Sequence, residues 1–225
     1  RPPPRSTLLP YTTLFRSRFI RYLNEIGCQI DTTTIKRPKC SSCRKPFLIL
    51  SKEQIQHLFN TPDLKSKSGL RDYLMLRMLY ETGIKVTEII GLTLSDVDFK
   101  RRRILCKSPY EQRVIYLNQD INKHLKKYLA LRAVDYSDAS TPIFANCYNQ
   151  CISRQGLWKL VKNYAELLGY DSAVTPHTLR HSFAVHLLQE GGTLRHLQMV
   201  MGHQDVSSTQ VYDDYVSAIT AIQAT

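Results

Sequence analysis

A short segment near the C-terminus carries residues that can bind and attack a phosphodiester. His177 and Arg180 lie one helical turn apart, directly after Pro176, which suits the first turn of a helix. A helix start of this kind favours a bound anion. His203 follows a glycine, and Tyr212 comes nine positions later. Because a tyrosine hydroxyl can attack phosphorus covalently, this order of residues predicts cleavage of a phosphodiester through a phosphotyrosine.

Each of these residues also has an ordinary interpretation when it is taken alone. A helix start often carries an incidental histidine and arginine, and a histidine after a glycine is usually a loop residue. Tyr212 is one of 13 tyrosines, and Tyr215 is a second candidate nucleophile. We expect Tyr215 to pack in the last helix.

The elements that must position these residues are predicted to be mostly helices. A capping-box pattern at Ser51 begins a helix that runs to about Asn60. Apolar periodicity predicts further helices over about residues 70–82, 86–90, 119–133, 153–168, 176–190, 193–201 and 207–215. Two short runs, 103–107 and 113–117, flank a Ser-Pro-Tyr turn and predict a β-hairpin. We therefore expect a mainly α fold with a small antiparallel β-sheet (α+β).

The charge of the chain favours a polyanionic partner. Its 225 residues include 31 Lys and Arg against 19 Asp and Glu, which gives a formal net charge of +12. Neutralising phosphates drives nucleic-acid affinity, so double-stranded DNA is the expected partner. No apolar run approaches the ~20 residues that cross a bilayer, and no signal peptide is evident. We expect a cytoplasmic protein that does not contact membranes.

The cysteines raise the question of a zinc site. Cys40 and Cys43 form a C-x-x-C pair, and Cys147 and Cys151 lie four positions apart. Four thiolates could hold zinc, but the two pairs are far apart in sequence and one lies in a linker-like stretch. We expect reduced thiols, no metal and no cofactor. A zinc-dependent nucleic-acid protein built on the first pair stays as an alternative that elemental analysis would test.

The chain divides into three predicted parts. Residues 1–17 read like the translation of a sequencing adapter, and we exclude them from fold reasoning as non-native. Residues 18–46 hold a short apolar helix and then a basic linker rich in Thr, Ser and Pro. Residues 47–225 are expected to form the domain that carries the chemistry.

The ordered motifs resemble those of the tyrosine recombinase (phage integrase) family, most closely its Xer-like bacterial members. The family pattern has an arginine in Gly-x-Arg-x-x-Glu, a lysine on a β-hairpin, His-x-x-Arg, Gly-His, and a tyrosine nine residues on. The matching positions here are Lys85 with Glu88, Lys107, His177 with Arg180, His203 and Tyr212. The match covers about residues 47–217. Residues 18–45 would then be the end of the family's N-terminal core-binding domain.

The resemblance implies a site-specific DNA recombinase that works through a covalent 3′-phosphotyrosine, with neither metal nor nucleotide. Arg180 would grip the scissile phosphate, and His203 would hydrogen-bond it. His177 would help manage the proton of Tyr212, and Lys107 would protonate the leaving 5′-oxygen. Glu88 would support position 85. The family also implies a tetramer of identical or paired recombinases on two DNA sites.

Two positions depart from the family pattern. Position 85 holds lysine, which offers a compact point charge in place of the two-pronged donor of arginine. Losing one such contact in the transition state typically costs ~10²–10³ in rate. The family's Gly-Lys-Gly is Cys-Lys-Ser around Lys107, with one extra residue before Arg113. Three alternatives follow for Lys85: a slow enzyme, a DNA-binding protein that does not cut, or a misread codon.

Overall fold

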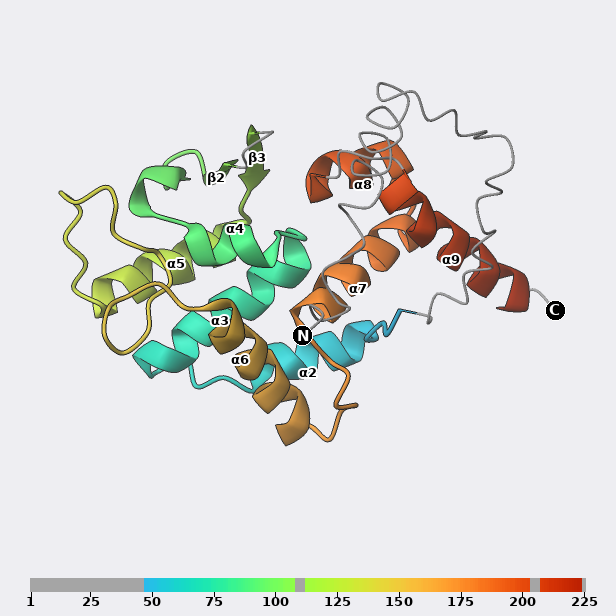
Figure 1. The fold of residues 1–225 in the computed structure, drawn as a ribbon, viewed down its shortest axis with the longest axis horizontal. Coiled ribbons are helices and arrows are strands. Elements are labelled where there is room, and N and C mark those ends of the chain that lie inside the picture. Colours follow the sequence, from blue (N-terminus) through green and yellow to red (C-terminus); the bar gives the residue numbers. More distant parts are fainter. Residues whose placement is uncertain (1–46, 108–111, 203–206, 224–225) are drawn as a thin grey trace, which may run out of the picture. The chain divides into compact units, whose positions relative to one another are not determined.

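The computed structural model describes residues 47–107, 112–202 and 207–223, and Figure 1 shows their arrangement. The described part is mainly helical with one small sheet, as expected. The helices are α2 (Lys52–Asn60), α3 (Lys67–Glu81), α4 (Val86–Gly91), α5 (Gln119–Leu131), α6 (Arg154–Leu167), α7 (Pro176–Gln189), α8 (Leu194–Met201) and α9 (Ser207–Gln223). A short 3₁₀ helix, η2 (Leu94–Asp96), precedes the strands β1 (Val97–Asp98), β2 (Arg103–Lys107) and β3 (Gln112–Tyr116).

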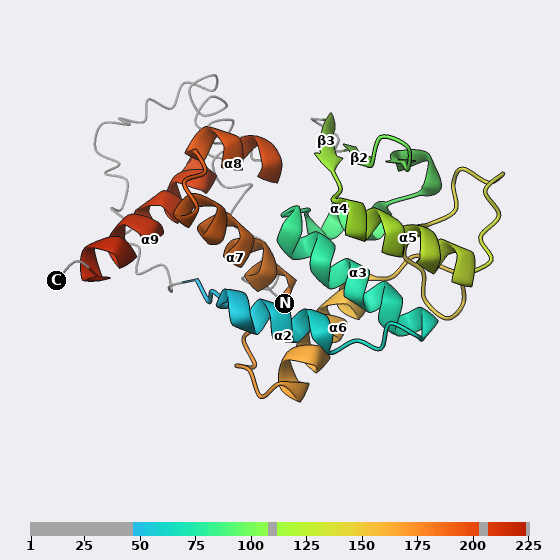
Figure 2. The same cartoon turned by 180° about the vertical axis from the view of Figure 1, so that it is seen from behind.

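Helix α3 is the centre of the core. Its sequence is apolar on nearly every side, so it must be surrounded, and α2, α5 and α7 all pack against it. Leu70, Leu74, Met75 and Met78 on α3 are fully buried. Figure 2 shows α2 and α5 beside α3 from the opposite side. The prediction of this helix was correct, although α3 begins three residues earlier than expected because Ser66 caps it.

Polar side chains fix where the helices begin. The capping box predicted at Ser51 is present, with the Ser51 hydroxyl and the Gln54 side chain each accepting a backbone N–H. Thr175 caps α7 in the same way and Pro176 occupies its first turn. The start of the helix that carries His177 and Arg180 is therefore set by local sequence.

The three strands form an antiparallel sheet in the order β1-β2-β3. In the predicted hairpin, Cys106 pairs with Arg113 and Lys107 pairs with Gln112. Side chains alternate between the two faces of a strand, so Arg113 and Cys106 point to one face and Lys107 to the other. The two-residue strand β1 was not predicted, since it is too short to show a period.

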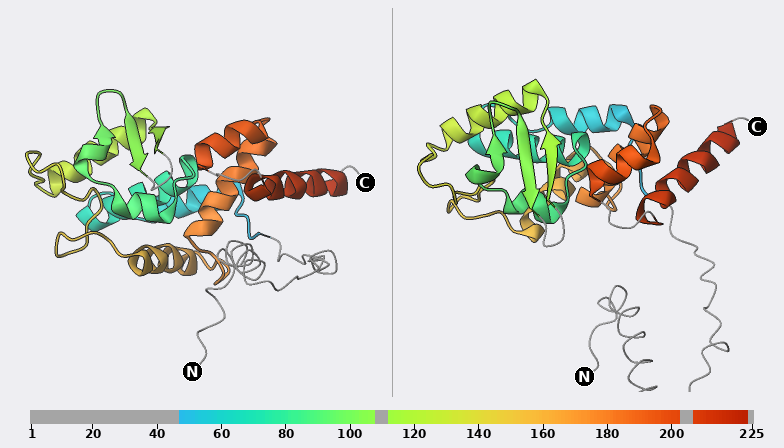
Figure 3. Two further views of the ribbon diagram at one scale, coloured as in Figure 1. Left: turned by 45° about the horizontal axis from the view of Figure 1, so that its top comes forward. Right: turned by 90° about the horizontal axis from the view of Figure 1, so that it is seen from above.

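Helices α7, α8 and α9 enclose a second apolar cluster. Val185, Leu197, Met201 and Tyr212 are buried there. Helix α9 continues to Gln223, past the predicted end near residue 215, and Figure 3 shows its far end projecting away from the other helices. Within the described ranges, no helix has both the length and the hydropathy to cross a membrane.

Candidate active site

Arg180 lies at the centre of the candidate site, one turn into α7. Its side chain is only 6% exposed, and Nη2 donates to the Met201 carbonyl at 2.7 Å while Nη1 donates to the Gly83 carbonyl. Burial, followed by the charge of Arg113, lowers the pKa of Arg180 to about 10. The guanidinium therefore stays charged at neutral pH, held by two chain segments.

Lys85 joins Arg180 from the turn before α4. Its Nζ donates to the Gly202 carbonyl at 2.6 Å, and its backbone N–H donates to Glu88 Oε2 at 2.8 Å. Gly83 begins this turn at φ +58°, and a Cβ at this position would lie 2.6 Å from Phe183. A glycine is therefore needed where the turn between α3 and α4 approaches Phe183 of α7.

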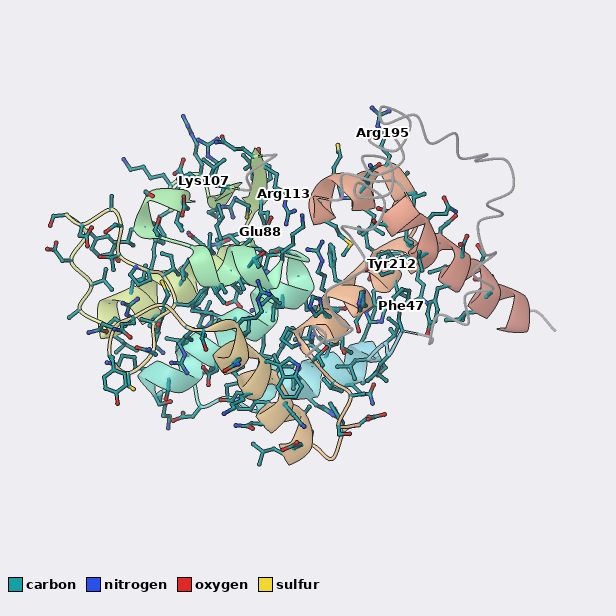
Figure 4. The ribbon with its side chains drawn as sticks, viewed as in Figure 1. Phe47, Glu88, Lys107, Arg113, Arg195 and Tyr212 are labelled. Atoms are coloured by element: carbon teal, nitrogen blue, oxygen red, sulfur yellow. The ribbon has the colours of Figure 1, made fainter. Side chains whose placement is uncertain are left out.

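Arg113 reaches the same place from β3. Its Nη2 pairs with Glu88 Oε2 at 2.7 Å, and its Nη1 donates to the Met201 carbonyl at 2.7 Å. Figure 4 shows Arg113 and Glu88 close together between the hairpin and α4. Sequence reasoning assigned Arg113 no role, because its partners lie 25 and 88 positions away in the chain.

A cavity of about 290 Å³ opens beside these cations. It is lined by Lys85, Val86, Thr87, Arg154, Trp158, Pro176, His177 and Arg180. The pKa of His177 is lowered, first by partial burial and then by the charges of Arg180 and Arg154. A neutral His177 among three cations leaves the cavity suited to an anion such as a phosphodiester. The positions of Arg154 and Trp158 carried no signal in the sequence.

Tyr212 is held by an aromatic cluster between α7 and α9. It is 4% exposed, and its hydroxyl lies 2.7 Å from Nδ1 of His181. The Phe47 ring stacks on the Tyr212 ring at 5.4 Å between centroids, and Figure 4 shows the two side by side. Burial raises the pKa of the Tyr212 hydroxyl, partly offset by the charge of Arg180. The Tyr215 ring makes a T-shaped contact with the Phe47 ring, with 6.2 Å between centroids.

His181 is the functional candidate that sequence reasoning missed. The sequence analysis assigned the proton of Tyr212 to His177, and the structure shows His181 in contact with the hydroxyl. The ring centroids of the two histidines are 6.3 Å apart. Burial, followed by the charges of His177 and Arg180, lowers the pKa of His181 to about 4, so its ring is neutral. The spacing of four residues, which places both rings on one helix face, was the available signal.

Lys107 is not brought to the cavity. Its Nζ pairs with Asp96 Oδ1 at 2.6 Å, on the face of the hairpin opposite Arg113. Burial alone would raise the pKa of Asp96, but hydrogen bonds from Lys107 and Thr93 lower it overall. His203 lies outside the described residues.

The thiols of the second cysteine pair, Cys147 and Cys151, are free and exposed. Among the side chains that the structure describes, no group of three His, Cys, Asp or Glu residues is placed to hold a metal ion. Cys40 and Cys43 lie outside the described residues.

Comparison with known proteins gives a consistent set of similarities. The phage integrase family model matches residues 49–217. The tyrosine recombinase XerD of Halalkalibacterium halodurans is 39% identical over 184 residues, covering 80% of this chain and 61% of the relative. The XerD of Listeria monocytogenes serovar 1/2a is 37% identical over 215 residues, covering 93% of this chain and 71% of the relative. The chain thus spans about six tenths of the first of these relatives.

Solved structures show the same fold. The XerA recombinase superposes with a TM-score of 0.67 at 26% identity, covering 95% of this chain and 74% of that one. The XerH site-specific recombinase, bound to a palindromic difH substrate in a post-cleavage complex, gives a TM-score of 0.68 at 22% identity. That match covers 80% of this chain and 52% of the XerH chain.

Proposed function

The chain belongs to the phage integrase family, and on that premise we propose that it is a site-specific DNA recombinase acting through a covalent 3′-phosphotyrosine. The observation that carries the proposal is the pairing of a buried tyrosine with a neutral imidazole near a cavity walled by cations. Tyr212 would attack the phosphorus, and Lys85 and Arg180 would hold its non-bridging oxygens.

The first step forms one bond and breaks one. The Tyr212 oxygen bonds to phosphorus while the bond from phosphorus to the 5′-oxygen breaks. His181 Nδ1, which lies 2.7 Å from the Tyr212 hydroxyl, would accept the tyrosine proton. The negative charge of a bound phosphate would raise the depressed pKa of His181 and so favour this transfer. The 5′-hydroxyl of a partner strand then attacks the phosphotyrosine, which rejoins DNA and restores Tyr212.

Lys107 keeps its proposed role as the acid that protonates the leaving 5′-oxygen, but only after it leaves Asp96. The proposal therefore includes a movement of the Lys107 side chain away from Asp96 when DNA binds. Glu88 positions Lys85 by accepting the backbone N–H of Lys85. His203, which follows α8 in the sequence, is proposed to hydrogen-bond the phosphate.

Double-stranded DNA is the proposed substrate, and the chain would act in the cytoplasm. The net charge of +12 and the DNA-bound XerH relative support this partner. A tetramer of recombinase protomers on two sites is proposed from family membership, because exchanging strands between two duplexes needs four cleavages.

A second candidate function is DNA binding without cleavage, and Lys85 is the observation that favours it. A lysine cannot supply the planar fork of an arginine to a phosphate. This form of the protein would bind DNA in a salt-sensitive manner and form no covalent adduct.

Nicked suicide duplexes from a random-sequence pool test the proposal. The unaltered protein, Lys85→Arg and Tyr212→Phe are incubated with the pool, and denaturation-resistant protein–DNA adducts are counted. We expect adducts from the first two and none from Tyr212→Phe. Adducts from Lys85→Arg alone would favour the binding protein, and their absence from both would contradict a recombinase.

A further inference from the structure

We infer that Arg113 is a positioning residue that fixes the phosphate-holding cations in place, an inference that rests on the proposed function. It acts through Glu88 and the C-terminal end of α8. Its guanidinium joins three chain segments that are distant in sequence: the β-hairpin, the start of α4 and the turn at Gly202.

Both terminal nitrogens of the Arg113 guanidinium donate hydrogen bonds. Nη2 pairs with Glu88 Oε2 at 2.7 Å, and the same carboxylate oxygen accepts the Lys85 backbone N–H at 2.8 Å. The Arg113 and Glu88 side chains are 10% and 7% exposed, so the pair is shielded from solvent. Truncating Arg113 would leave the Glu88 carboxylate buried without its main counter-charge, which is strongly unfavourable.

Arg113 and Arg180 share one hydrogen-bond acceptor. The Met201 carbonyl accepts from Arg113 Nη1 and from Arg180 Nη2, each at 2.7 Å. The next carbonyl, that of Gly202, accepts from Lys85 Nζ at 2.6 Å. The end of α8 therefore orients both cations proposed to hold the phosphate, and Arg113 anchors that end.

Gly202 leaves room for this arrangement. It has φ +59°, and a Cβ added there would overlap Nη1 of Arg113 and lie 2.9 Å from its Cζ. The guanidinium thus lies directly on the backbone of Gly202, in the space that any other residue would fill. A shift of the Arg113 side chain would therefore move the backbone at Gly202, and with it the carbonyls that hold Lys85 and Arg180.

This geometry separates Arg113 from the acid step. Arg113 faces α4 and α8, whereas Lys107 lies on the other face of the hairpin against Asp96. Loss of Arg113 should impair phosphate holding and leave leaving-group protonation intact. Misplacing reacting groups by about 1 Å costs about 10² in rate, which sets the expected size of the effect.

The experiment measures single-turnover adduct formation by the full chain with Arg113→Ala, Arg113→Lys and the control Arg101→Ala. Arg101 lies beside the same hairpin with a side chain that is 72% exposed. Each variant is given an ordinary suicide duplex and one with a 5′-bridging phosphorothiolate, whose sulfur leaves without protonation. DNA affinity and urea unfolding are measured alongside.

We expect both Arg113 variants to cleave about 10²-fold more slowly on both substrates, with DNA affinity changed less than about threefold. Millimolar guanidinium should restore part of the rate to Arg113→Ala and none to a Tyr212→Phe control. Rates equal to the Arg101→Ala control would overturn the inference. Rescue by the phosphorothiolate would also overturn it, because Arg113 would then act through Lys107.

A readout independent of cleavage separates this inference from the proposed function. Arginine side-chain ¹⁵N NMR follows Arg180, which shares the Met201 carbonyl with Arg113. We expect the Arg180 signal to shift in Arg113→Lys and to stay unchanged in Arg101→Ala, even if no variant cuts DNA. An unchanged Arg180 signal in Arg113→Lys would refute the positioning role.

Discussion

The hydroxyl of Tyr212 lies 2.7 Å from Nδ1 of His181, and this contact joins α9 to α7. The proposed nucleophile is thereby tied to the helix that also carries Arg180, the neighbour of His181 in sequence. The Phe47 ring packs against both rings. Its centroid lies 4.7 Å from the His181 ring centroid and 5.4 Å from the Tyr212 ring centroid. Phe47 thus packs on the groups proposed to start the reaction.

His181 should make the fold sensitive to acid. Its pKa is about 4 in the folded chain against an ordinary value of 6.5. Below pH 6.5 His181 is protonated in the unfolded chain but stays neutral in the folded chain. The free energy of unfolding therefore falls as the pH is lowered to about 4. The loss reaches at most about 3 kcal/mol.

Urea unfolding at pH 7.5 and pH 4.5 measures the effect, with His181→Asn as the comparison. The pKa values of His177 and His186 are lowered too, so both proteins should lose stability in acid. The variant should lose clearly less. An equal loss in the two proteins would mean that His181 titrates normally.

Replacing Lys85 with arginine should speed cleavage. The second prong of a guanidinium could contact a phosphate oxygen while the first keeps the Gly202 carbonyl, and one such contact is worth ~10²–10³ in rate. Single-turnover adduct formation measures the change, with Lys126→Arg, exposed on α5, as the control. A slower Lys85→Arg would show that the site is adapted to lysine.

Removing the amine of Lys107 should slow only the protonation of the leaving oxygen. We expect Lys107→Met to cleave an ordinary phosphodiester 10²–10⁴-fold more slowly, the usual contribution of a general acid. On a 5′-bridging phosphorothiolate the loss should be under about tenfold. Equal losses on the two substrates would remove Lys107 from the acid role and leave it paired with Asp96.

Adding one methyl group at Gly202 should destabilise the protein by about 2–3 kcal/mol, because alanine is strained at φ +59° and its Cβ would displace Arg113. Gly91→Ala is the matched control, since nothing lies within 4 Å of a Cβ there. Urea midpoints compare the two variants. A Gly202→Ala protein as stable as Gly91→Ala would contradict the close packing of Arg113 on this turn.

Local sequence was enough to predict most of the elements. The Ser51 capping box and the Pro176 helix start depend on residues within one turn, so their patterns were direct evidence. The hairpin followed from two alternating runs around a turn. The end of α9 was missed because helix length depends on neighbours and on continued propensity as much as on a stop signal.

The site was harder to predict than the fold. The motif order indicated Lys85, Glu88, Lys107, His177, Arg180, His203 and Tyr212. The structure brings Lys85, Glu88 and Arg180 together near the end of α8, and it places Lys107 against Asp96. The motif order could not indicate Arg113, because its partners lie on α4 and at the end of α8, far away in the sequence. It named His177 for the tyrosine proton and did not consider His181, whose contact with the Tyr212 hydroxyl depends on where α9 packs.

The most direct test of the central claim is to identify the amino acid joined to DNA. Adducts from the unaltered protein or Lys85→Arg are digested with protease and nuclease, and the nucleotide-bearing peptide is sequenced by mass spectrometry. We predict a 3′-phosphoryl link to Tyr212, with adducts retained in Tyr215→Phe. A link to Tyr215, to a serine or to a 5′-phosphate would contradict the account.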